Sequence, residues 1–143
     1  MSNNVKLIVL VCLAIALPGC RGLWTALGVT AAAGVGAAAV YYAKGDLEAD
    51  FDDDLNDVYG ASVGVLTDRG YLVNDTDSKI EGNEADVEAT IPAIGAEDAR
   101  DVSIHLEQEG GRTSISIRVG VFGDEGLSRE ILSGIEARLP GPG

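Results

Sequence analysis

The chain has 143 residues, of which 23 are acidic and 10 basic, so its formal net charge is −13 at pH 7. This surplus of negative charge repels phosphate backbones, which excludes nucleic acid as a partner. The length leaves room for an N-terminal segment and one small globular core.

Residues 1–19 have the layout of a bacterial lipoprotein signal peptide. Lys6 supplies one positive charge, and residues 7–17 (LIVLVCLAIAL) form an apolar run that is shorter than the roughly 20 residues of a spanning helix. The order Leu17-Pro18-Gly19-Cys20 then matches a lipobox. We therefore expect cleavage before Cys20 and attachment of palmitate or a similar lipid to that cysteine. The alternative is an N-terminal anchor with an ordinary buried cysteine.

Cleavage would leave a membrane-anchored chain with one cysteine. Cys12 departs with the signal peptide, so no intramolecular disulfide can form. A cysteine with two or three acyl chains is an effectively permanent anchor, whereas a single chain holds only marginally. Arg21 follows Cys20, in place of the Asp that retains enteric lipoproteins in the inner membrane. The expected location is the cell envelope, at the periplasmic face of the outer membrane.

Residues 20–43 comprise the lipidated cysteine and a Gly/Ala-rich apolar segment, uncharged from Leu23 to Ala43. A helix of about 20 residues would measure about 30 Å. Small residues recur at every fourth position, a pattern that lets helices approach closely in lipid: Ala26, Thr30, Gly34 and Ala38. Three arrangements fit a helix here: contact with lipid or a protein partner beside the membrane, packing against the following domain, and a membrane span. We favour the first, with self-association through residues 23–43 as one form of it.

Residues 44–139 are predicted to form a small α+β domain. Alternating apolar residues over 45–51 predict a strand with one solvated side. A helical period then runs to Leu66, with acidic residues at its start and Gly70 as its stop. Further strands are expected over 71–76, 84–91, 101–109 and 112–122, and a closing helix capped by Asp124 runs to Leu139. The tail 140–143 (PGPG) cannot continue that helix.

The last two strands flank Gly110-Gly111, which is typical of a two-residue hairpin turn. Pairing Glu109 with Arg112 aligns the apolar residues of both strands on one face. The domain order is therefore β-α-β-β-β-β-α, an antiparallel sheet with both helices on one face, preceded by the N-terminal apolar helix. The other face carries polar side chains and is expected to be solvated: Ser103, His105, Glu107, Ser114, Ser116 and Arg118.

No catalytic, cofactor-binding or metal-binding residue is assigned. The acidic run 50–57 lacks the Gly and the Glu that an EF-hand loop requires, so helix capping and surface charge account for it. His105 is the only histidine and is expected to be exposed and uninvolved. The serines lie in regular strands rather than at a strained nucleophile turn. Gly120 and Gly123 do not form a phosphate loop. Gly123 is expected to end the strand and let the chain turn into the last helix.

Three segments resemble an uncharacterised family of short bacterial lipoproteins. They are Gly45 to Ala49, the helix start Leu55 to Tyr59, and the stretch Ile117 to Ser128. The resemblance implies a lipobox, a Gly/Ala-rich apolar segment and a small α/β body of unknown function. It brings no catalytic residues with it.

These observations predict a non-enzymatic envelope lipoprotein with a structural or adaptor role, anchored to the membrane through Cys20 and needing no cofactor. The alternative is a periplasmic binding module that takes a peptide or a lipid on the polar sheet face or in a groove beside the helices.

Overall fold

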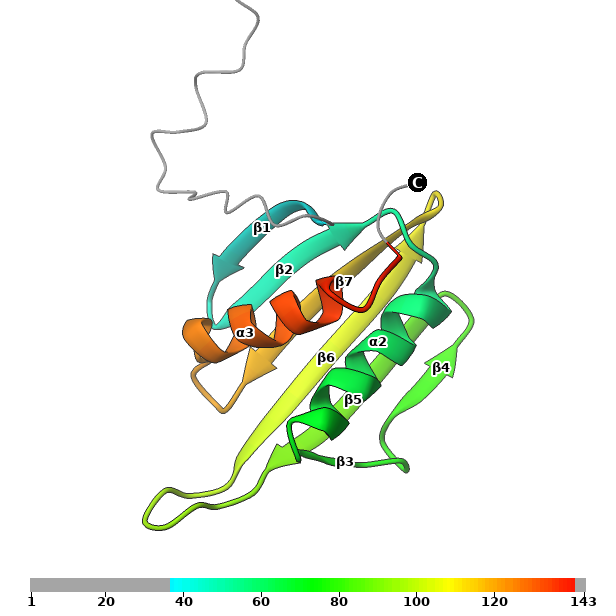
Figure 1. Cartoon of the computed structure of the whole chain (residues 1–143). Helices are drawn as coiled ribbons and strands as arrows, with labels where there is room; N and C mark the ends of the chain where they lie inside the picture. The colour runs from blue at the N-terminus through cyan, green and yellow to red at the C-terminus, as the bar shows by residue number, and fades with distance from the viewer. Residues whose placement is uncertain (1–36, 141–143) are drawn as a thin grey trace, which may run out of the picture. The chain divides into compact units, whose positions relative to one another are not determined.

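Seven antiparallel strands form one sheet, and two helices cover one of its faces (Figure 1). The computed structural model describes residues 37–140; the predicted signal peptide (1–19), Cys20, residues 21–36 and the end of the tail lie outside them. Within the described part, neither helix is long and apolar enough to cross a membrane. The elements are β1 (Ala37–Ala43), β2 (Asp46–Phe51), α2 (Leu55–Asp68), β3 (Leu72–Val73), β4 (Lys79–Glu81), β5 (Glu84–Ile91), β6 (Arg100–Glu109), β7 (Arg112–Val119) and α3 (Glu125–Glu136).

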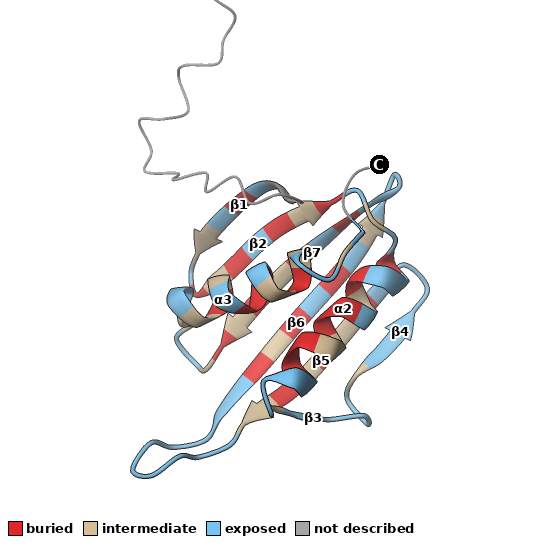
Figure 2. Cartoon of the chain, viewed as in Figure 1, coloured by how far each residue is buried: buried red, intermediate tan, exposed pale blue. Residues whose placement is uncertain are grey.

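Burial alternates along the long strands, and the buried residues all face the helices (Figure 2). The strands lie in the order β1-β2-β7-β6-β5-β3, with β4 also pairing with β5. Both helices add aliphatic side chains to the core, among them Val58 and Leu66 of α2 and Ile131 and Ile135 of α3. The expected α+β sheet with both helices on one face is confirmed.

The hairpin between β6 and β7 has the predicted register. Glu109 pairs with Arg112, and the apolar pairs of the two strands follow in step. Gly110 and Gly111 have φ angles of 59° and 83°, as the two central residues of the favoured hairpin turn require. This register sends alternate residues of both strands into the core.

The prediction of a continuous helix through residue 43 is wrong for residues 37–43. This segment is β1, and it pairs antiparallel with β2, with Tyr41 opposite Glu48. Val40 is buried against the core and Tyr41 is exposed, which is the two-residue period of a strand. Small and β-branched residues tolerate either structure, so pairing with the edge of the sheet decides it. The sheet therefore begins seven residues before the predicted boundary.

Three smaller differences lie in the loops. Only Leu72–Val73 forms a strand within 71–76, because the Asn74 carbonyl accepts from the backbone N–H groups of Asp77 and Ser78 and turns the chain back. The chain then returns as the unpredicted β4. β7 ends at Val119, before the expected residue 122, and a turn follows.

We expect Val40→Asn to destabilise the protein by about 1–3 kcal/mol, because a buried amide without a partner replaces an apolar contact. Tyr41→Asn changes an exposed neighbour and should stay within about 0.5 kcal/mol of the parent. Urea unfolding of the full chain in detergent measures both values. Equal effects of the two variants would contradict the strand assignment of residues 37–43.

Candidate functional site

The sheet face opposite the helices carries polar side chains in rows that cross the strands. One row joins four strands through paired positions, in the order Glu48, Ser116, His105 and Asp86. A second row is more acidic, with Asp50, Ser114, Glu107 and Glu84 at paired positions. The rows form because residues two apart along a strand share a face.

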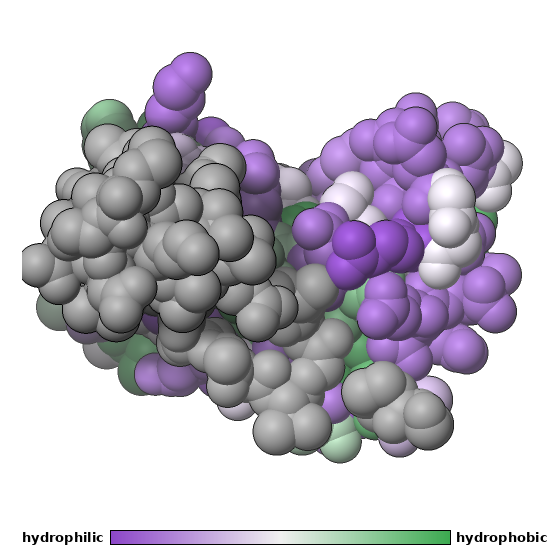
Figure 3. Space-filling view, turned by 90° about the horizontal axis from the view of Figure 1, so that it is seen from above, coloured by the Kyte–Doolittle hydropathy of each residue, from purple (hydrophilic) through white to green (hydrophobic). Residues whose placement is uncertain are grey.

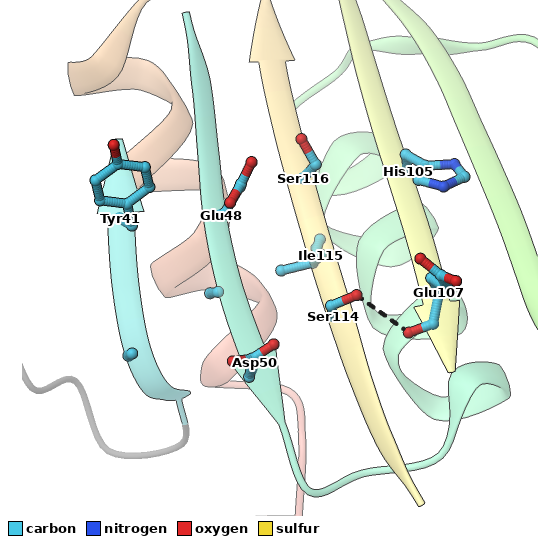
Figure 4. Close-up of a pocket in the computed structure, with 10 residues that line it drawn as sticks. Tyr41, Glu48, Asp50, His105, Glu107, Ser114, Ile115 and Ser116 are labelled. Atoms are coloured by element: carbon cyan, nitrogen blue, oxygen red, sulfur yellow. Dashed lines mark hydrogen bonds between the residues drawn. The ribbon is translucent and has the colours of Figure 1, made fainter. Parts of the chain in front are cut away.

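A hollow of about 360 Å³ lies on this face. Three carboxylates border it, from Glu48 and Asp50 of β2 and Glu107 of β6 (Figure 4). Tyr41 of β1 lies at one side, and Ser114 and Ser116 of β7 lie between the acidic groups. The Ser114 hydroxyl donates to the Glu107 carbonyl at 3.3 Å.

Several polar or charged side chains in or near the hollow already have partners, and His105 is one of those that line it. Arg118 donates two hydrogen bonds to Asp46, at 2.7 and 2.5 Å. Nδ1 of His105 lies 2.8 Å from the Asp86 carboxylate. Among the ion pairs of residues 37–140, none includes the carboxylates that line the hollow.

The arrangement suits a cationic or hydrogen-bond-donating group. Ionised carboxylates accept hydrogen bonds and donate none, and the serine and tyrosine hydroxyls can do both. An ammonium or guanidinium group in the hollow would meet acceptors from three strands. No cluster of three or more potential metal ligands occurs in the described part of the chain.

The histidine and serines lie where the sequence predicts them. His105 is about half exposed on the polar face, and Ser114 and Ser116 lie on β7, a regular strand. Ser103 donates to Glu88 at 2.8 Å. Cys20, the predicted lipidation site, lies outside the described residues.

The acidic run before α2 makes contacts that hold loops together. Asp52 pairs with Arg112 at 3.0 Å. Asp54 occupies the N-cap of α2, but its carboxylate accepts from Gln108 at 3.2 Å rather than from the helix backbone. The expected side-chain cap is therefore absent at α2. It is present at α3, where the Leu127 N–H donates to Asp124 at 3.0 Å and, together with Arg100, lowers the pKa of that carboxyl.

Sequence reasoning missed Tyr41, Glu48 and Asp50 as members of the polar face. The prediction of a helix through residue 43 removed Tyr41 from the sheet. The signal for the other two was present, because Glu48 and Asp50 alternate with the buried Leu47 and Ala49. Their neighbours across the sheet come from β7, which no local pattern identifies.

A family described as "Protein of unknown function (DUF3568)" matches residues 5–138. The chain belongs to this family. No curated protein matches the sequence. The expected resemblance to a family of unknown function is thus confirmed, and the match extends from the apolar N-terminal run to the end of α3.

We expect the second, more acidic row to lower the free energy of unfolding of the domain. Glu84 and Glu107 lie directly opposite each other on β5 and β6, and like charges at such positions destabilise a sheet. Glu107→Gln should therefore raise the free energy of unfolding by about 0.2–1 kcal/mol at low salt, and added salt should reduce the gain. Asp75→Asn makes the same charge change in an exposed loop and serves as the control. Urea unfolding at two salt concentrations checks this, and an equal gain in both variants would contradict it.

Proposed function

We propose that the protein is a lipid-anchored bacterial envelope protein with a non-enzymatic structural or adaptor role, held at the periplasmic face of the outer membrane. The observation that carries the proposal is the order Leu17-Pro18-Gly19-Cys20 after an apolar run of signal-peptide length. The family match includes this N-terminal region together with the folded domain.

The geometry of the domain supports an adaptor. Sixteen residues (21–36) lie between Cys20 and the first residue of β1, so a fully extended connection would reach about 55 Å. Within the described residues β1 pairs with β2 alone, so its other edge presents backbone N–H and C=O groups. An extended segment of a partner can add to such an edge through main-chain hydrogen bonds.

Cys20→Ser should abolish incorporation of labelled palmitate and release the chain from the membrane fraction. Cys12→Ser should leave both unchanged, because that cysteine lies in the part removed by cleavage. Metabolic labelling and intact mass measurement of the mature chain check the two variants. Labelling that persists in Cys20→Ser, or a mature chain that starts at another residue, would refute the anchor.

A second candidate function is a binding module for a peptide, favoured by the hollow on the polar face. The hollow adjoins β1, so a peptide that pairs with the free edge of β1 and then turns over the polar face could place a basic side chain among Glu48, Asp50 and Glu107. A peptide would then be held by main-chain hydrogen bonds and selected by charge.

Trilysine is the probe for this second function, and triglutamate is its control. Trilysine should shift the backbone NMR signals of Ser114 and Ser116, and a chain with Glu48→Gln, Asp50→Asn and Glu107→Gln should lose these shifts. Raised salt should weaken the binding because the contacts are ionic. Shifts spread evenly over all acidic surfaces would show nonspecific attraction and contradict a site in the hollow.

A further inference from the structure

The two most exposed large apolar residues of the described part lie side by side in one turn. Val121 and Phe122 are 83% and 92% exposed, between the end of β7 and the start of α3. Ile94, also exposed, belongs to the β5–β6 loop at the same end of the sheet. The opposite end, with the Gly110–Gly111 hairpin, presents a mainly hydrophilic described surface (Figure 3).

Contact between two backbones holds this turn in place. Gly45 and Gly123 have φ angles of 94° and 80°, and each packs against the other turn. A Cβ at Gly45 would lie 2.7 Å from the Phe122 carbonyl oxygen, and a Cβ at Gly123 would meet the Gly45 backbone. The β1–β2 turn and the β7–α3 turn therefore need glycine at both positions.

Arg118 joins the same two turns through its guanidinium group. It donates to the Lys44 carbonyl at 3.2 Å and the Val121 carbonyl at 3.4 Å, besides the paired bonds to Asp46. The hydrogen bond to Asp46 raises the pKa of Arg118, whose guanidinium group is charged at neutral pH in any case. On the other side, Arg100 binds Asp124 at 2.9 Å. These contacts hold the backbone of the turn that carries Val121 and Phe122 in a fixed conformation.

We propose that the turn from Gly120 to Gly123 is a membrane-contacting tip, which inserts Val121 and Phe122 into the bilayer that anchors the chain. The inference rests on the proposed lipid anchor. Two side chains cannot bury the roughly 1,200–2,000 Å² of a stable protein interface. They are enough for a second, shallow contact once a tether has made the encounter intramolecular. Lys44, Arg100 and Arg118 lie near the turn, and so do the carboxylates of Asp46, Asp101 and Asp124, so the charges around the turn are largely balanced.

The connection to the anchor is long enough for this contact. Ala37 lies at the far end of β1 from the turn, because Ala37 pairs with Phe51 and Asp46 pairs with Arg118. Seven residues of strand span about 24 Å. Residues 21–36 can reach about 55 Å when extended and about 24 Å as the expected helix, so either form allows the tip to turn back to the same bilayer.

The test places a single tryptophan at the tip. Trp24, the chain's one tryptophan, is changed to Phe, and Phe122→Trp or the control Ser133→Trp on the exposed side of α3 is added. The chain is attached through Cys20 to phosphatidylcholine vesicles with brominated acyl chains, which quench tryptophan on contact. We expect about threefold stronger quenching in Phe122→Trp, because interfacial side chains reach about 5–10 Å into the headgroup and acyl boundary.

The anchor and the tip are judged separately. Flotation of the chain with vesicles shows whether the anchor is attached. If cells do not acylate Cys20, the Cys20 thiol of a Cys12→Ser chain is coupled to a maleimide lipid instead. Quenching is then measured in the same way. Equal, weak quenching of both tryptophans in floated chain would overturn the proposal. Protection of Phe122→Trp from acrylamide in native envelopes but not in pure lipid vesicles would assign the turn to a protein partner, which also overturns it. A thermal unfolding midpoint equal to the parent's confirms that the tip variant is folded.

Discussion

The register between β6 and β7 decides the rest of the domain. With Glu109 opposite Arg112, aliphatic side chains from both strands project toward α2 and α3. A slip of one residue would send them to the opposite face and bring the polar rows into the core. β2 and β5 pair on either side of this hairpin, and their apolar residues lie opposite those of β7 and β6. The position of the hollow therefore follows from the same constraint that builds the core.

The fold separates three distinct surfaces. The helices occupy one face of the sheet, and the acidic rows occupy the other. The end with the Gly45–Gly123 contact carries the exposed apolar turn. A domain of strongly negative charge is repelled by anionic surfaces, so under the proposed anchor an apolar tip would allow contact with a bilayer without laying an acidic face on it.

Local patterns predicted most of the core and only part of the candidate site. The alternation that marks β5, β6 and β7, and the Asp124 cap of α3, lie within short stretches of sequence and were correctly predicted. The same local reasoning failed at Asp54, where Gln108 from a distant strand competes for the carboxylate. It also failed for β1, because a Gly/Ala-rich apolar segment suits a helix as well as an edge strand.

The sequence by itself determined most of the residues that face the core, where the β6–β7 hairpin turns and where α3 begins. Each of these depends on neighbours within a few positions and on the fixed periods of helix and strand. Only the tertiary structure decided that residues 37–43 extend the sheet, that Glu48 and Glu107 border one hollow, and that Gly45 meets Gly123. These depend on contacts between segments far apart in the chain, whose free energy is gained only when the whole sheet assembles.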